Sequence, residues 1–383
     1  QYFNLWRESG DLFEFAESLA AAASACLSSQ KAQFYGDTLF VKQRGNKGTS
    51  WHVDLDHVPL DTEDFLTFWI PLQDVPGLDE HGSPLIFVDG SHLNNTNLPA
   101  ASLATHGPLQ VGDVTVHSGR TLHAAPALRT PSERWAWALS FFVPGARVKH
   151  LPMQDEEHEA HDEWAGSLPT GALAEHALLP VFDAPATVPE RFGQSIVVGQ
   201  TTFANRPWLN FYHGKLLADS GLADAAAQCF KNLRTTSSLS LQFLCAHSLG
   251  LLYHHTNNLE DSEFRLRDAV QLAEGLPDSD LDRAEVMTDL ALLLRDRDAA
   301  MLAEGYLRSS LDLRQKSLGS LHRDTLVTVY SLADVLEELG QLKEAQVHFA
   351  TELAWCQSTL GVHHHETRAS QRNWDRFQAK HGL

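Results

Sequence analysis

The fold of the first part of this chain is decided by residues 51–72, which read WHVDLDHVPLDTEDFLTFWIPL. The run from Phe65 to Leu72 is apolar and rich in aromatic residues, which is typical of a buried β-strand. A second strand-like run, Thr38 to Lys42, precedes the stretch. His52 and Asp54 therefore fall where one predicted strand passes to the next, and side chains at strand ends are held stiffly.

The pair His52 and Asp54, followed at a distance by His123, has the form of a metal site with two histidines and one carboxylate. Two nitrogens and one oxygen on one face of an octahedron leave three positions open, which is typical of non-heme iron oxygenases. We prefer iron to zinc because zinc sites are usually closed by four ligands or use other spacings. The donor set alone also admits Mn or Co, and the alternative is three polar residues satisfied by ordinary hydrogen bonds.

Arg134 lies eleven residues after His123, at the start of the strand-like segment 134–142. A guanidinium at this place can hold a carboxylate through two parallel charge-assisted hydrogen bonds. The alternative is a strand residue that faces solvent or pairs with a nearby acid.

The order of these residues resembles the phytanoyl-CoA dioxygenase family of iron(II)/2-oxoglutarate oxygenases. The resemblance covers residues 1–148, and further motifs that carry it are Trp69–Asp74, His81–Leu85, Gly90–His92, Gly112-Asp113 and Gly119-x-x-x-His123. Val53 departs from the family, in which a polar residue commonly separates the first two ligands. This position binds no metal, so the departure leaves the ligand set intact.

The resemblance implies that His52, Asp54 and His123 are the catalytic ligands of Fe(II), with 2-oxoglutarate and O₂ as cosubstrates. It implies that Arg134 binds the distal carboxylate of 2-oxoglutarate. It also places Trp69 on the strand beside the cosubstrate, although an aromatic residue in this run is equally typical of core packing.

Thr67, His57 and His117 also lie in or near these motifs. Thr67 lies two residues before Trp69, so it faces the same side of the strand and can offer its hydroxyl to the cosubstrate. We expect structural or solvent-exposed roles for His57 and His117 rather than places at the mouth of a substrate pocket. Family members act on fatty acyl-CoA, small metabolites and natural products, so we expect a small-molecule or lipid-like substrate.

Residues 1–148 alternate between helix-like and strand-like patterns with frequent glycine and proline, which predicts an antiparallel jelly roll. A helix is expected over residues 11–28. Pattern and resemblance together predict a double-stranded β-helix of the cupin-like kind with flanking helices. The chain opens at Gln1, inside what resembles the helical lead-in of the family, so we expect a truncated N-terminus.

Residues 149–200 are rich in acids, histidine and proline, and we expect a linker or a wrap over the oxygenase domain.

From residue 201 to 383 the pattern is helical and repeats every 42 residues, as in Leu290 and Leu332 or Ala303 and Ala345. A fixed period of this size predicts stacked helical hairpins in an all-α solenoid. The segment 317–345 resembles the tetratricopeptide repeats of kinesin light chains, and His322 with His364 is expected to cap repeat helices.

The composition of the chain argues against some classes of partner and favours one kind of cellular compartment. The formal net charge is −20, which argues against a nucleic-acid partner because phosphate contacts require clustered Lys and Arg. No stretch of eighteen apolar residues occurs, so no transmembrane segment is expected. The chain has 4 cysteines and no C-x-x-C pair, which favours a reducing, intracellular and cytoplasmic location, with the organelle open because of the N-terminus.

The sequence therefore predicts a 2-oxoglutarate-dependent dioxygenase that hydroxylates an organic substrate and carries a repeat domain for a protein partner. The competing hypothesis, from another class, is a tetratricopeptide scaffold whose oxygenase-like domain is inactive. The presence of His52, Asp54, His123 and Arg134 together favours the enzyme, because a scaffold needs none of them.

Overall fold

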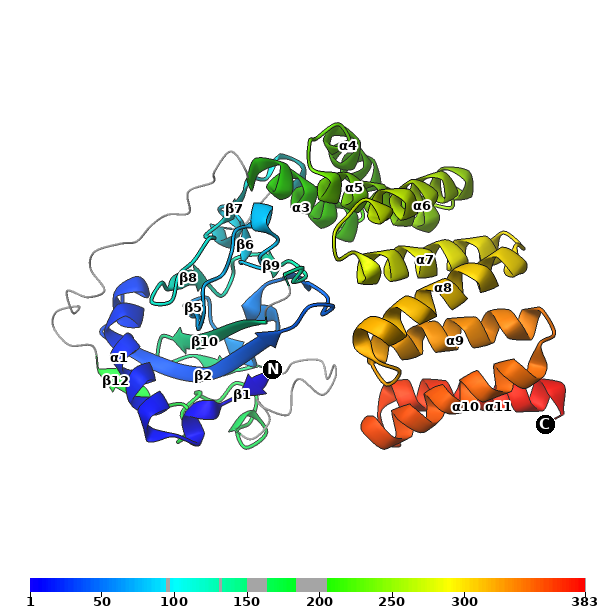
Figure 1. Ribbon diagram of the computed structural model, residues 1–383. Helices are drawn as coiled ribbons and strands as arrows, with labels where there is room; N and C mark the ends of the chain where they lie inside the picture. Colours follow the sequence, from blue (N-terminus) through cyan, green and yellow to red (C-terminus); the bar gives the residue numbers. More distant parts are fainter. Residues whose placement is uncertain (94–96, 131–132, 150–163, 184–204, 383) are drawn as a thin grey trace. The chain divides into compact units, whose positions relative to one another are not determined.

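A computed structural model describes residues 1–93, 97–130, 133–149, 164–183 and 205–382. The chain forms two compact units, residues 1–213 and 214–383. The first is built mainly of strands and the second of helices (Figure 1).

Two larger antiparallel sheets and one two-stranded sheet form the described β-structure of the first unit. The larger sheet has the order β1-β2-β10-β5-β8, with β12 also paired to β2, and the smaller sheet has the order β3-β9-β6-β7. This arrangement confirms the predicted double-stranded β-helix. The bounds are β1 Tyr2–Phe3, β2 Lys31–Lys42, β3 Thr49–His52, β4 Leu60–Asp61, β5 Phe65–Pro71, β6 Ile86–Val88, β7 Leu103–Thr105, β8 Thr115–Ser118, β9 His123–Ala125, β10 Arg134–Phe142, β11 Arg147–Val148 and β12 Val181–Asp183, with β4 paired to β11.

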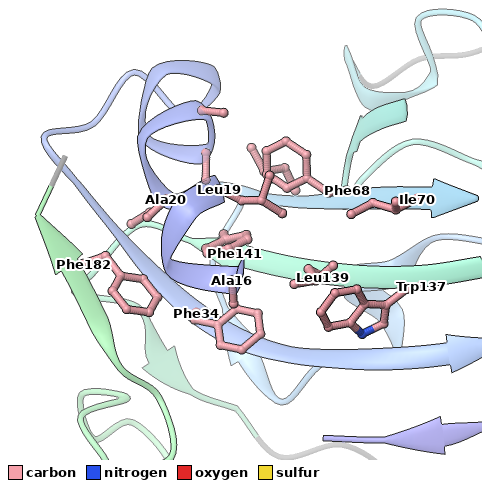
Figure 2. Close-up of a cluster of buried hydrophobic side chains, with 14 residues drawn as sticks. Ala16, Leu19, Ala20, Phe34, Phe68, Ile70, Trp137, Leu139, Phe141 and Phe182 are labelled. Carbon is pink, nitrogen blue, oxygen red and sulfur yellow. The ribbon is translucent and has the colours of Figure 1, made fainter. Parts of the chain in front are cut away.

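One face of the larger sheet is covered by helix α1, Gly10–Cys26 (Figure 2). Ala16, Leu19, Ala20 and Ala23 recur at the spacing of one helical face and are buried there. They pack against the outward side chains of the sheet, which are listed in the order of the strands as Phe34, Leu66, Phe68, Ile70, Trp137, Leu139 and Phe141. Because side chains alternate along a strand, the intervening residues of β5 and β10 face the interior between the two sheets.

The segment predicted as a linker or wrap is described only in its middle part, and residues 150–163 and 184–200 lie outside the described residues. In the described part, Trp164 and Leu179 are each 1% exposed and pack in a core cluster with Tyr35 and Phe65. Strand β12 then extends the larger sheet at β2. The described residues 164–183 therefore wrap onto the first unit.

The helices of the repeat region follow one another as antiparallel pairs along the chain (Figure 1). Leu290 and Leu332, one period apart, are both buried, as are Ala303 and Ala345, and this confirms the predicted tetratricopeptide solenoid. The bounds are α3 Asn205–Asp219, α4 Ala223–Leu233, α5 Leu239–His255, α6 Leu259–Glu274, α7 Asp280–Asp296, α8 Ala300–Leu318, α9 Arg323–Glu338, α10 Leu342–Thr359 and α11 His365–His381.

Two histidines one period apart begin equivalent helices. The ring of His322 accepts a hydrogen bond from the Asp324 N–H at 3.2 Å, and the ring of His364 accepts one from the Glu366 N–H at 3.2 Å. Each satisfies an amide that the first turn of a helix leaves without a partner. The predicted capping role is confirmed at both positions. Among the described residues, no helix combines the length and the apolar character needed to cross a membrane.

Candidate metal centre

His52 and His123 are brought together by strand pairing. His52 ends β3, His123 begins β9, and the two residues are directly opposite in the antiparallel register. Their ring centroids lie 4.2 Å apart. Asp54 begins the short 3₁₀ helix Asp54–Asp56, directly after β3. The three predicted ligands therefore come from one strand pair and the turn that follows it.

Potential ligand atoms of these three residues all lie within 4.8 Å of one another. The Oδ1 atom of Asp54 is 3.6 Å from Nε2 of His52 and 3.5 Å from Nε2 of His123. The His52 and Asp54 side chains are 25% and 19% exposed, whereas the His123 side chain is 5% exposed. The cluster is thus anchored in the core through His123, and His52 and Asp54 are partly exposed to solvent.

The outer nitrogen of each histidine fixes its tautomer. Nδ1 of His52 is 2.9 Å from the Ser50 carbonyl oxygen, and Nδ1 of His123 is 2.9 Å from the Thr121 carbonyl oxygen. A carbonyl only accepts, so each Nδ1 carries the proton and each Nε2 presents a lone pair toward Asp54. Metal-binding histidines are oriented in this way by a backbone carbonyl.

The protonation states also suit a cation. Burial alone would raise the pKa of the Asp54 carboxyl, but the hydrogen bond and positive potential of His117, and then His123 and His52, hold that pKa far below its usual value. Burial, followed by the charge of His117, lowers the pKa of His123 to about 4. An ionised carboxylate and a neutral imidazole are the forms that bind a metal.

Gly119 of the Gly119-x-x-x-His123 motif lets the turn before β9 approach strand β5. A Cβ at this position would lie 2.6 Å from Cδ1 of Phe65 and 3.1 Å from Cγ of Leu55. The backbone of Gly119 donates to the Phe65 carbonyl at 2.7 Å and accepts from the Leu55 N–H at 3.0 Å. This close contact ties the Asp54–Asp56 turn to the turn that precedes His123.

The other oxygen of Asp54 has two partners inside the protein. Oδ2 accepts from Oγ1 of Thr67 at 2.8 Å and lies 3.2 Å from Nε2 of His117. The Thr67 hydroxyl, predicted to contact the cosubstrate, is therefore engaged by Asp54, and its predicted role stays a prediction. His117 is 8% exposed, and its contact with Asp54 was not foreseen from the sequence. His57 is exposed, with its ring centroid 6.0 Å from that of His52.

Arg134 is buried at 4% exposure, and its guanidinium carbon lies 5.1 Å from the centre of the Trp69 ring. Nη1 donates to the Ser83 carbonyl at 3.0 Å, whereas the buried Nε has no hydrogen-bond partner in the described structure. Burial lowers the pKa of Arg134 to about 10, so the group stays charged at neutral pH. Trp69 itself is 3% exposed and packs in the apolar cluster between the sheets.

Lys42 is the residue of this region that sequence reasoning missed. It is directly opposite Arg134 in the β2–β10 register and is 8% exposed. Its Nζ donates to the Pro126 carbonyl at 2.9 Å and to Oγ of Ser83 at 3.4 Å. The sequence held one signal for it. Lys42 lies two residues after Phe40, so it falls on the same inward face of the strand, where an apolar residue is usual.

Comparisons with known proteins agree with this organisation. Residues 6–136 match the family model described as phytanoyl-CoA dioxygenase (PhyH), and residues 282–351 match the one described as tetratricopeptide repeat. Among curated proteins, the clustered mitochondria protein homologs of Aspergillus fumigatus and Emericella nidulans are 29% and 27% identical over 118 and 116 residues. Each match covers 30% of this chain but only 9% and 10% of those proteins, so the chain spans a small part of their length.

The similar solved structures include two enzymes from nogalamycin biosynthesis and a repeat protein. The non-heme alpha-ketoglutarate-dependent carbocyclase SnoK is 22% identical and the epimerase SnoN is 25% identical; each match covers 47% of this chain and 75% of the other, with a TM-score of 0.41. TPR-like repeats of a Podosopora anserina protein named as a kinesin light chain are 20% identical, covering 46% of this chain and 88% of theirs, with a TM-score of 0.41. By these family models, the chain combines a phytanoyl-CoA dioxygenase-like (PhyH) domain, residues 6–136, with tetratricopeptide repeats, residues 282–351.

Proposed function

We propose that residues 1–148 form an iron(II)/2-oxoglutarate-dependent dioxygenase that hydroxylates a small-molecule or lipid-like substrate. We also propose that residues 201–383 form a repeat domain that binds a protein partner, with residues 149–200 between the two. The observation that carries the enzymatic proposal is the cluster of His52, Asp54 and His123, whose ligand atoms lie within 4.8 Å of one another.

The donor set supports Fe(II) as the metal. Both imidazoles are held by backbone carbonyls so that Nε2 faces the cluster, and Asp54 supplies one carboxylate oxygen at 3.6 Å and 3.5 Å from those nitrogens. Three protein ligands of this kind leave positions for a bidentate cosubstrate and O₂. His52, Asp54 and His123 would hold the metal.

The charge balance supports a dicarboxylate cosubstrate. Lys42 and Arg134 are buried side by side, and among the described residues their hydrogen-bond partners are Ser83 and Pro126, with no acidic side chain. Burying two like charges is costly unless an anion compensates them. The distal carboxylate of 2-oxoglutarate would supply that anion, and the unpaired Nε of Arg134 is an additional donor for it.

The chemistry available to such a loaded centre is decarboxylation of 2-oxoglutarate to succinate and CO₂, coupled to hydroxylation of a substrate C–H bond by O₂. The chain contributes orientation and a dry environment for this chemistry. Arg134 is held in place by the Ser83 carbonyl and by the face of Trp69. Ala136 and Ala138, on the same face of β10, are small and add no polar group near the cosubstrate.

Anaerobic titration with Fe(II) and 2-oxoglutarate tests the proposal. We expect the wild type to develop the weak visible charge-transfer band of an iron-bound 2-oxo acid, and to release succinate when air is admitted. His52→Ala should abolish both signals, whereas His57→Ala, which changes an exposed neighbouring histidine, should retain them. A well-folded wild type without the band would instead favour the inactive scaffold.

The repeat domain offers a polar groove for the proposed protein partner. The groove has a volume of about 740 Å³ and is lined by residues of α7, α9 and α11 together with Asp298 and Ala300. Asp334 is one of the lining residues and pairs with Arg295 and Arg376. A partner captured by the wild type should be lost with Asp334→Ala and kept with Glu344→Ala, which removes an ion pair with Arg308 outside the groove lining. An intracellular, cytoplasmic location stays a prediction.

A further inference from the structure

Three polar side chains form a row across the larger sheet. Thr67 on β5 is directly opposite His117 on β8 and directly opposite Ser140 on β10. Directly opposed residues on neighbouring strands project from the same face of a sheet. All seven residues of β5 are buried, so the row lies in the protein interior, where each polar group needs a partner.

The hydrogen bonds of the row run in one direction, toward Asp54. The Thr67 hydroxyl donates its single proton to Oδ2 of Asp54 at 2.8 Å, so the Ser140 hydroxyl, 3.0 Å from Oγ1 of Thr67, donates to Thr67. A carboxylate only accepts, so Nε2 of His117, at 3.2 Å from Oδ2, carries the proton. Nδ1 of His117 is buried without a hydrogen-bond partner in the described structure, so the contact with Asp54 is the hydrogen bond that the ring makes there.

This pattern divides the two oxygens of Asp54 between two tasks. Oδ2 is occupied by Thr67 and His117 on the sheet side, whereas Oδ1 lies 3.6 Å and 3.5 Å from Nε2 of His52 and His123. A carboxylate with both oxygens free can take two coordination positions on one cation. A carboxylate with one oxygen committed to two donors takes one.

We propose that the row of His117, Thr67 and Ser140 is a positioning device that limits Asp54 to one ligating oxygen and so preserves the coordination positions that the cosubstrates need. The inference rests on the proposed function. His117 and Thr67 contact Asp54 directly, and Ser140 acts on Asp54 through Thr67. An apolar row would pack this strand at lower cost, since each buried polar group must find a partner.

Metal titration of the full chain tests this role without turnover. Co(II) is the probe, because its visible absorption reports both affinity and coordination number. Thr67→Val keeps the shape of the side chain and removes one donor to Oδ2, and His117→Phe removes the other. We expect each to weaken Co(II) binding by about 10- to 100-fold, the usual cost of losing an outer-shell partner, and to change the intensity of the visible bands.

Conservative and matched variants separate positioning from packing. His117→Gln keeps an N–H donor near Nε2 and should recover part of the affinity, and Ser140→Ala should cost only a few-fold. Thr115→Val is the matched control, because Thr115 is also buried on β8, but its hydroxyl lies 3.5 Å from the Trp69 carbonyl and has no contact with Asp54. It should bind Co(II) as the wild type does.

The outcomes distinguish this inference from the proposed function. Wild-type binding of Co(II) that is lost in His52→Ala, together with unchanged affinity and spectrum in Thr67→Val and His117→Gln, would reject the row and leave the metal centre standing. A wild type that does not bind Co(II) would overturn both. Thermal unfolding of each metal-free variant shows that it is folded, and if His117→Phe does not fold, Thr67→Val and His117→Gln decide the question.

Discussion

Lys42 and Arg134 face each other across strands β2 and β10, both buried, with Ser83 as a shared hydrogen-bond partner. Burial, and then the charge of Arg134, lowers the pKa of Lys42 to about 7. Two cations in this position repel each other in the absence of an anion. This repulsion destabilises the protein without metal and cosubstrate. Binding of a negatively charged ligand would relieve it.

Replacing Lys42 should weaken the binding of 2-oxoglutarate. Lys42→Met keeps the length of the side chain and removes its charge, and we expect the Kd for 2-oxoglutarate to rise about tenfold, the equivalent of ~1.4 kcal/mol. Calorimetry on the Fe(II)- or Co(II)-loaded protein measures it. Lys47→Met is the control, because Lys47 is exposed and lies shortly after the same strand. Equal Kd values for the wild type and Lys42→Met would remove Lys42 from the cosubstrate site.

The same lysine should make stability depend on pH. Its folded pKa of about 7 lies below the unfolded value near 10.4, so between these pH values the unfolded chain binds more protons and the free energy of unfolding rises with pH. Below pH 7 both states are protonated and the penalty is complete. From pH 7 to pH 9 the free energy of unfolding should therefore rise by at most about 2–3 kcal/mol through this lysine.

Urea unfolding of the metal-free and ligand-free protein at these two pH values measures the effect. Lys42→Met lacks the penalty, so its stability advantage over the wild type should shrink as the pH rises from 7 to 9. The difference between the two proteins cancels the titration of all other groups. An advantage that is constant or grows with pH would contradict the assigned direction.

Trp69 should act on the cosubstrate through Arg134. The guanidinium carbon of Arg134 lies 5.1 Å from the centre of the indole ring, a contact worth about 0.5–2 kcal/mol. Trp69→Leu should therefore raise the Kd for 2-oxoglutarate by roughly 2- to 30-fold and leave the affinity for Co(II) near the wild-type value. If the substitution weakens both ligands equally, Trp69 acts by general packing of the core instead.

In the repeat domain, Glu337 should stabilise the contact between α9 and α11. Its side chain is 3% exposed and accepts from Lys380 at 2.9 Å, from His381 at 3.0 Å and from Arg376 at 3.1 Å. Burial would raise the pKa of Glu337, but these three partners lower it. Because the folded pKa is depressed, the stabilisation is present above the unfolded pKa near 4.3 and is lost as the pH falls through the folded value.

Glu337→Gln should thus lower the free energy of unfolding by about 1–2 kcal/mol at pH 7, since Arg376 and Lys380 are partly exposed and water screens their charges. The deficit should narrow below pH 4. Glu344→Gln, at an exposed ion pair with Arg308, should cost under about 0.5 kcal/mol. A loss for Glu337→Gln that stays the same at both pH values would point to altered packing rather than charge.

The sequence by itself determined the features that are local or periodic. His52 and Asp54 are two residues apart at a strand end, so their proximity follows from the chain, and the motif around His123 supplied the third residue. The strand pattern within residues 1–148 and the 42-residue period of the helices predicted both folds, because burial of one face imposes a regular spacing on apolar residues.

Only the tertiary structure decided which distant side chains meet. Lys42 opposite Arg134, and Thr67 between His117 and Ser140, depend on the register of strands that are far apart in the chain. A shift of one residue would send every one of these side chains to the other face. That register is set by the packing of α1 and both sheets as a whole, so no local pattern in the sequence contains it.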